Sequence, residues 1–176
     1  MSKILLETIN LSKTYKHVNG NINLFNNLNL RIKQGDLVAL VGPSGSGKSS
    51  LLHLLALLDE PTEGDIKLNN VLTRKFADEK KDETRRKNIS IIFQDDNLLN
   101  DFTAIENVMM PSIIKGENMK NAKNKAKTIL KKIKILNRAQ HFPKELSGGE
   151  QQRVAIARAI IAETNIILAD EPTGNL

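Results

Sequence analysis

Apolar and polar positions along the chain predict strands and helices in alternation. Residues 4–9 and 22–33 form two N-terminal strands, the second with a clear period-two alternation. Residues 37–41 form a continuous apolar run, which is typical of a strand buried on both faces of a parallel sheet. Apolar segments at 89–93 and 165–169 predict two further strands of this kind.

Helices are predicted between these strands. Residues 48–59 contain no helix breaker and are almost wholly apolar, so we expect a helix buried on every side. Helical patterns also cover 103–114, 119–136 and the residues from Ser147 to about Glu163. A short hairpin at 66–72 and a charged, partly helical stretch at 74–87 complete the prediction. The pattern indicates an α/β core that carries a helical insertion.

Composition narrows the class of protein. The chain has 176 residues, enough for one domain with a sizeable core. It contains no cysteine, which excludes thiol nucleophiles and zinc sites built from cysteine, and we expect an intracellular protein. The N-terminus turns acidic too early for a signal peptide, and every apolar run is shorter than a membrane-spanning helix requires.

The net charge of +6 is concentrated in one segment. Eight lysines and one acid lie between Lys115 and Lys134, which leaves the rest of the chain close to neutral. Because aromatic residues make up only 3% of the chain, single-stranded nucleic acid has few rings on which to stack. We therefore expect no nucleic-acid partner and a solvated helix face, with contact to anionic lipid headgroups as the alternative.

Residues 42–49 match the phosphate-binding pattern G-x-x-x-x-G-K-S. Glycines let backbone N–H groups approach a phosphate, Lys48 reaches the β- and γ-phosphates, and the Ser49 hydroxyl is a Mg²⁺ ligand. A glycine-rich turn without a ligand is the alternative, but the position between a strand and a helix favours nucleotide binding. The expected nucleotide-binding residues here are Gly42, Pro43, Ser44, Gly45, Ser46, Gly47, Lys48, Ser49 and Ser50.

Two adjacent acids, Asp170 and Glu171, follow the last predicted strand. In a parallel sheet, the carboxyl end of such a strand lies beside the phosphate loop. Asp170 can hold Mg²⁺ through its water shell, and Glu171 can act as the general base toward the attacking water. A solvated strand end without function is the alternative interpretation.

Residues 146–153, with the sequence LSGGEQQR, resemble the signature motif of ABC-type ATPases. An ordinary helix with a capping box would explain Ser147 and Glu150 but neither the double glycine nor the QQR continuation. The resemblance implies a P-loop NTPase fold with a RecA-like parallel core, an N-terminal antiparallel β subdomain and an inserted α-helical signature subdomain. It implies one domain over residues 1–176, with the nucleotide-binding core at 1–94 and 155–176 and the helical subdomain at 95–154.

The same resemblance implies roles for further residues. Gln94 resembles the glutamine that touches Mg²⁺ and the attacking water and links to the transport subunit. Tyr15 resembles the aromatic residue that stacks on adenine, with a strand-edge tyrosine as the alternative. A head-to-tail homodimer is implied, in which the signature segment of one copy closes over the γ-phosphate bound by the other. The implied contacts of that segment are Ser147, Gly148 and Gly149.

Softer motifs at 53–62 and 98–108 resemble the ATPase subunit of bacterial lipoprotein-releasing transporters. Macrolide-export and cell-division relatives share most of them and stay as alternatives. The resemblance implies integral membrane permease subunits as partners, a peripheral location at the cytoplasmic face of the bacterial inner membrane, and ATP hydrolysis coupled to lipoprotein release. Chromosome and repair ATPases are disfavoured, because residues 42 and 147 are too close for a long intervening coiled coil.

The last residues, Gly174, Asn175 and Leu176, resemble the start of the family's D-loop. The family pattern continues with an aspartate, a switch histidine and further core strands, whereas all three histidines here precede Asp170. We therefore expect a chain truncated at its C-terminus, with the last part of the core missing. An ATP-binding remnant without turnover is the corresponding alternative function.

Overall fold

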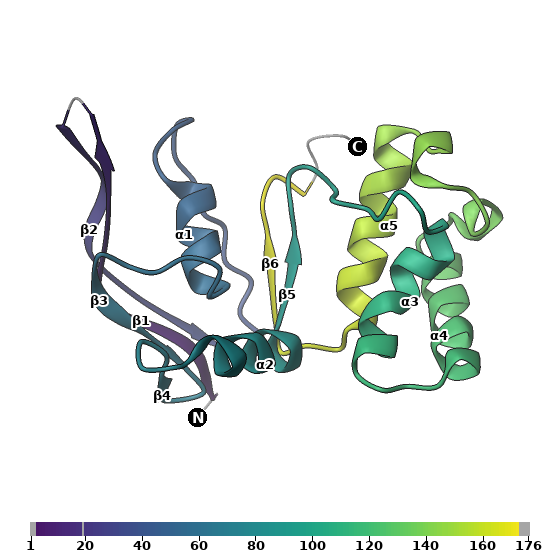
Figure 1. The fold of residues 1–176 in the computed structure, drawn as a ribbon, viewed down its shortest axis with the longest axis horizontal. Coiled ribbons are helices and arrows are strands. Elements are labelled where there is room, and N and C mark those ends of the chain that lie inside the picture. The colour runs from purple at the N-terminus through teal and green to yellow at the C-terminus, as the bar shows by residue number, and fades with distance from the viewer. Residues whose placement is uncertain (1–2, 19, 173–176) are drawn as a thin grey trace. The chain divides into compact units, whose positions relative to one another are not determined.

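The computed structural model describes residues 3–18 and 20–172, which divide into two units, Met1–Arg85 and Arg86–Leu176. The division falls within helix α2 (Asp78–Asn88), the charged segment whose helical character the sequence predicts. Antiparallel strands dominate the N-terminal unit, and helices packed beside a parallel strand pair dominate the C-terminal unit (Figure 1).

Four strands of the N-terminal unit form an antiparallel sheet in the order β2-β1-β3-β4. Asn69 and Asn70 connect the last two strands with φ angles of 49° and 67°, which a two-residue hairpin turn requires, so the predicted hairpin is confirmed. The strands are β1 (Ile4–His17), β2 (Gly20–Lys33), β3 (Glu63–Leu68) and β4 (Val71–Leu72). The buried apolar side chains of this unit include Leu6, Leu11, Ile66, Leu51, Leu54 and Leu55.

Helix α1 (Lys48–Leu55) is shorter and less buried than its composition predicts. Only Leu51, Leu54 and Leu55, at helical spacing, are buried, whereas Ser49 and His53 are exposed. The chain leaves the helix at Ala56, and Leu57 has a φ of 57°. The expectation of a helix buried on every side over 48–59 is therefore wrong, because this helix covers its neighbours with one side only.

Residues 37–41 do not form the predicted strand. Leu37 and Val41 have exposed fractions of 101% and 87%. A strand exists only as part of a hydrogen-bonded ladder, and no strand of the described residues pairs with this segment. An apolar run thus favours burial, but it forms a strand only where a neighbouring strand is available to pair with it.

The C-terminal unit contains a parallel strand pair, β5 (Ile89–Ile92) and β6 (Ile166–Ala169), as predicted. Their register pairs Ile92 with Ala169, so both strands end at the same edge. Helix α5 contacts β5 and also packs against α3 and α4 (Figure 1). The helices are α3 (Ala104–Ile114), α4 (Met119–Lys132) and α5 (Gly148–Ile161), with short 3₁₀ turns η1 (Leu136–Arg138) and η2 (Pro143–Glu145) before α5.

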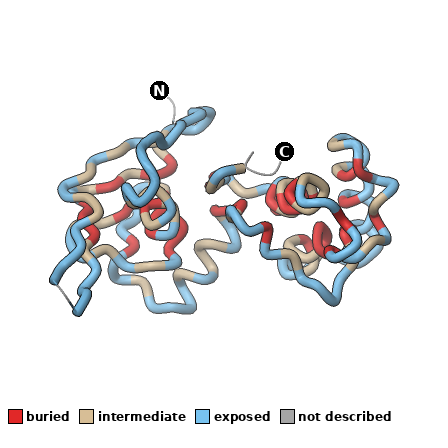
Figure 2. Tube along the Cα trace, turned by 90° about the horizontal axis from the view of Figure 1, so that it is seen from above, coloured by how far each residue is buried: buried red, intermediate tan, exposed pale blue. Residues whose placement is uncertain are grey.

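A hydrophobic cluster fills the space among the three helices. Figure 2 colours buried positions red, and they recur along the C-terminal helices. The lysines of α4 are exposed. The cluster includes Val108, Ala126, Leu130, Val154, Ala157 and Ile161. Its members reach to Ile161, beyond the end of the expected helical subdomain at 154, and the division of the chain at 95–154 stays a prediction. Across residues 3–18 and 20–172, no helix is both long and apolar enough to cross a membrane.

Candidate functional site

The phosphate-binding loop, residues 42–47, leads directly into α1. Gly45 and Gly47 have φ angles of 79° and 87°, a region that glycine enters without a steric penalty. A Cβ on Gly47 would lie 3.1 Å from the Cβ of Leu24 in β2, whereas a Cβ on Gly45 would meet open space. The loop therefore packs on the sheet at one glycine and leaves its backbone accessible at the other.

Lys48 begins α1 and bends back over the loop. Its Nζ donates hydrogen bonds to the carbonyl oxygens of Gly42 and Pro43, both at 2.9 Å. In the same turn, Ser49 is exposed and Ser50 is half-buried. The N–H groups in the first turn of a helix have no acceptor within that helix. This combination of a held ammonium group, open amides and a hydroxyl fits a phosphate chain with its counter-ion.

Tyr15 lies in β1, opposite Ile22 of β2 and beyond Ser12, the last residue of β1 that pairs with β3. Its hydroxyl donates to Asp59 Oδ2 at 2.9 Å, and Lys13 Nζ lies 4.6 Å from the ring centroid. Burial opposes ionisation of Asp59, but hydrogen bonds from Lys13 and Tyr15 outweigh it and lower the pKa of this carboxyl. The ring is thus held in place while 41% of the residue stays exposed.

Gln94, Asp170 and Glu171 lie at the shared carboxyl edge of β5 and β6. The backbone N–H of Asp170 donates to Ile92 O at 2.9 Å, which continues the ladder past the end of β6. Gln94 follows β5 by two residues and is exposed, as is Glu171. The parallel pairing therefore brings these three predicted residues to one edge, and their chemical roles stay predictions.

Gln152 contacts this edge and was not among the expected site residues. It is fully buried in α5, and its Nε2 donates to the carbonyl oxygen of Glu171 at 3.3 Å. Glu171 has a φ of 46°, so its backbone is held in the left-handed region. The QQR continuation of the signature motif contained a signal for this contact, because a generic helix start does not require glutamine there.

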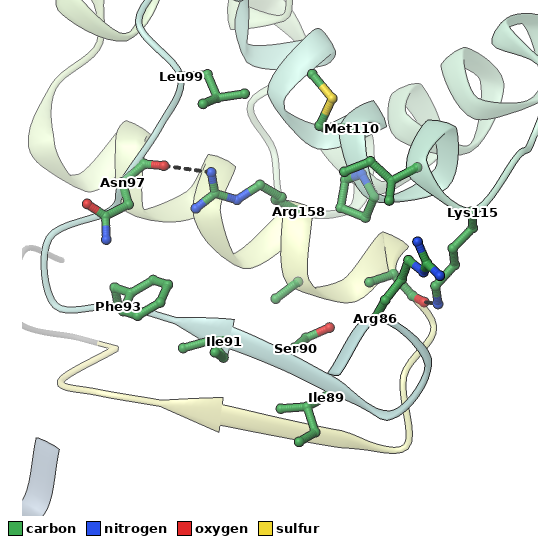
Figure 3. A pocket seen from close by; sticks show the side chains of 14 residues that line it. Arg86, Ile89, Ser90, Ile91, Phe93, Asn97, Leu99, Met110, Lys115 and Arg158 are labelled. Atoms are coloured by element: carbon green, nitrogen blue, oxygen red, sulfur yellow. Dashed lines mark hydrogen bonds between the residues drawn. The ribbon is translucent and has the colours of Figure 1, made fainter. Parts of the chain in front are cut away.

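The segment after Gln94 is fixed by Arg158 of α5. Its guanidinium donates to the carbonyl oxygens of Asp96 and Asn97, each at 2.8 Å. Figure 3 shows the bond to Asn97. Burial raises the pKa of the Asp96 carboxyl, although the charge of Arg158 opposes this shift. An open hollow of about 430 Å³ lies beside these contacts, lined mostly by apolar residues of β5, α3 and α5 (Figure 3).

The signature segment forms the N-terminal cap of α5. The Oγ of Ser147 accepts from the N–H of Glu150 at 3.3 Å, and Glu150 Oε2 accepts from the N–H of Ser147 at 2.9 Å, so the expected capping box is present. Gly148 and Gly149 are the first two residues of the helix. The backbone bond from Ser147, followed by the bond from Arg138 Nε at 2.8 Å, lowers the pKa of Glu150 to about 2.

Each unit therefore contributes its own set of predicted residues. The N-terminal unit carries the phosphate loop and Tyr15, and the C-terminal unit carries Gln94, Asp170, Glu171 and the signature segment. The residues that resemble the D-loop, Gly174, Asn175 and Leu176, lie outside the described residues.

Comparison with protein families adds an independent finding: the family model described as "ABC transporter" matches residues 25–174. The chain is 49% identical over its whole length to the "Lipoprotein-releasing system ATP-binding protein LolD" of Rickettsia bellii (strain RML369-C) and covers 77% of that protein. It is 44% identical over its whole length to the LolD proteins of Legionella pneumophila strains Lens and Paris and covers 78% of each.

Two solved structures resemble this one with a TM-score of 0.93, and in each case the match covers 98% of this chain and 76% of the other. One, 41% identical, is a dimeric post-hydrolysis state of the ATP-binding cassette MJ0796 bound to ADP and Pi. The other, 42% identical, is the dimeric structure of MJ0796, described as a bacterial ABC transporter cassette.

Proposed function

Because the chain belongs to the ABC transporter family of ATPases, we propose that it binds and hydrolyses ATP to energise lipoprotein release from the bacterial inner membrane. The likeness over its whole length to three lipoprotein-releasing ATP-binding proteins carries this proposal. Macrolide export and cell division are not favoured, because none of these three relatives belongs to those systems.

ATP binds at the phosphate loop in this proposal. The accessible backbone at Gly45, the first N–H groups of α1 and the ammonium group of Lys48 hold the phosphates, and the ring of Tyr15 stacks on the adenine. Ser49, Gln94 and Asp170 supply oxygen atoms, the donors that Mg²⁺ prefers. When bound, Mg²⁺ neutralises negative charge on the phosphates. The accessible backbone at Gly45 and the exposed Ser49 support this assignment.

Glu171 is the general base of the proposed reaction, and Gln94 orients the water that Glu171 deprotonates. The exposed Glu171 side chain is free to meet substrate, while its backbone is tied to Gln152. Glu171 and Gln94 lie at the same edge of the β5–β6 pair, and this supports a joint role at the attacking water.

A head-to-tail homodimer completes each site, with Ser147, Gly148 and Gly149 of one copy facing the γ-phosphate bound by the other. The capped, glycine-rich start of α5 supports this role, because the first N–H groups of a helix favour anions. Both similar solved structures are dimers. The dimer works with integral permease subunits at the cytoplasmic face of the inner membrane, as a peripheral protein.

The substitution Glu171→Gln tests the reaction. We expect ATP hydrolysis to fall about 100-fold or more, because the general base is lost, while ATP affinity is retained. Phosphate release and equilibrium binding of ATP measure the two effects separately. Glu79→Gln, on the exposed surface of α2, is the matched control and should leave both unchanged. Wild-type hydrolysis in Glu171→Gln would contradict the role of Glu171, and absence of ATP binding in the parent protein would contradict the proposed function itself.

The transport assignment needs a separate measurement. We expect the protein, reconstituted in proteoliposomes with the permease subunits of its own organism, to release a lipoprotein into solution only when ATP is added. Release should be absent with Glu171→Gln. Export of a macrolide without lipoprotein release would contradict the assignment.

A further inference from the structure

The signature segment carries a negative charge where the proposed function places a phosphate. Glu150 is the third residue of α5, in the turn whose N–H groups favour an anion. Its pKa of about 2 leaves the carboxylate ionised throughout the physiological range. An uncompensated carboxylate at this point would repel the triphosphate. The fold must therefore neutralise this charge if the segment is to face ATP.

Arg138 provides a cation at this position. Its Nε lies 2.8 Å from Glu150 Oε1, while the other carboxylate oxygen, Oε2, accepts from the Ser147 N–H at 2.9 Å. Both oxygens thus have a hydrogen-bond partner, and the side chain of Glu150 is 17% exposed. His141 is a second titratable group beside the guanidinium, and its Nε2 lies 3.4 Å from Arg138 Nη1.

The backbone around Arg138 is anchored to the helical core. Ile135 and Ala139, on either side of it, are buried in the hydrophobic cluster. The carbonyl oxygens of Ala139 and His141 accept from the N–H groups of Ile105 and Ala104, at the start of α3, at 2.9 and 2.8 Å. Tertiary contacts therefore hold the turn that carries Arg138, and they fix the backbone position from which its guanidinium reaches α5.

We propose that Arg138 is a positioning residue of the signature segment, which neutralises Glu150 and holds its carboxylate on the Ser147 backbone so that the segment can face the ATP bound by a second copy. This inference rests on the proposed function, because it assumes that ATP lies between two copies. It assigns to Arg138 an effect on ATP-dependent dimerisation that acts through the charge of Glu150.

A charge-rescue experiment tests the inference in the full chain. All variants carry Glu171→Gln, so that ATP persists, and light scattering measures the ATP concentration for half-maximal dimerisation. We expect Arg138→Met to raise this concentration about tenfold or more, because Glu150 is left unpaired. Adding Glu150→Gln should restore it to within about threefold, since glutamine retains the capping bond and lacks the charge.

Arg31→Met is the matched control. Arg31 Nε pairs with Glu7 Oε1 at 2.6 Å on the sheet of the N-terminal unit, which is the same type of ion pair away from the signature segment. This variant should dimerise as its parent does. Thermal unfolding of every variant then shows whether Arg138→Met has lost the fold or only the charge balance.

The outcomes separate the two proposals. Unchanged dimerisation in Arg138→Met overturns the inference alone, and so does a double variant that stays as defective as Arg138→Met, because Arg138 would then act only through structure. If the parent Glu171→Gln protein forms no ATP-dependent dimer, the dimeric site of the proposed function fails, and the inference fails with it.

Discussion

The phosphate loop and the signature segment are both glycine-containing segments at the start of a helix, yet different contacts hold them in place. In the phosphate loop, Lys48 binds the carbonyl oxygens of its own loop, and left-handed glycines set the turn. In the signature segment, Glu150 closes the cap and is itself held by Arg138, from a turn tied to α3. The first geometry is local, whereas the second depends on tertiary packing.

This difference has a consequence for how each segment responds to mutation. A side chain of the phosphate loop can be removed with little effect on the fold, because its partners are loop carbonyls that water can reach. In the signature segment, by contrast, the cap and the ion pair are held by the packing of the C-terminal unit. Substitutions there should change stability and ATP-dependent dimerisation together.

Lys48→Ala should give the largest difference between an effect on ATP affinity and an effect on stability. We expect ATP affinity to fall about 10- to 100-fold, because a charge-assisted bond to phosphate is lost, while the free energy of unfolding changes by less than about 0.5 kcal/mol. Titration calorimetry and urea unfolding measure these quantities. Lys80→Ala, which removes an exposed lysine of α2 in the same unit, is the control and should bind ATP normally. A large loss of stability in Lys48→Ala would show that the loop is not locally determined.

Ser147→Ala and Thr103→Ala form a matched pair, because each residue is the N-cap of a capping box, on α5 and α3 respectively. Each substitution should lower the free energy of unfolding by about 1 kcal/mol. Only Ser147→Ala should also weaken ATP-dependent dimerisation. Urea unfolding and light scattering at increasing ATP measure the two effects. Equal dimerisation defects in both variants would mean that the signature segment responds to stability alone.

The pH dependence of stability should give the smallest effect. The pKa of Glu150 is lowered to about 2 in the folded protein, so the unfolded chain takes up the proton first as the pH falls. The contribution of the Glu150 carboxylate to the free energy of unfolding is therefore complete above its ordinary pKa of 4.5 and is lost between pH 4.5 and pH 2. The stability difference between the parent and Glu150→Gln should shrink over this window, and high salt should reduce it. Urea unfolding at pH 7 and at pH 3 measures it, and an unchanged difference would contradict the prediction.

Much of this protein could be predicted from local sequence. The Asn69-Asn70 turn, the Ser147 cap and the parallel strands that precede Gln94 and Asp170 all depend on residues close in the chain or on a simple apolar pattern. Glycine at positive φ and a capping side chain act within a few residues, so the order of residues is enough to specify them.

Other features depended on partners far along the chain. Residues 37–41 are apolar enough for a buried strand, but no strand of the described residues supplies the ladder. Helix α1 ends at Leu55 and buries only the side that carries Leu51, Leu54 and Leu55, which its apolar composition did not predict. The contacts of Gln152 with Glu171, and of Arg138 with Glu150, join residues 19 and 12 positions apart through helix packing.

The sequence by itself therefore determined the family, the phosphate loop and the cap of the signature helix, because those depend on residue types at fixed short spacings. The tertiary structure alone decided which side chains hold the signature segment and the strand edge in place. The physical reason is that hydrogen bonds and ion pairs between distant residues exist only after the hydrophobic cluster of α3, α4 and α5 has brought their elements together.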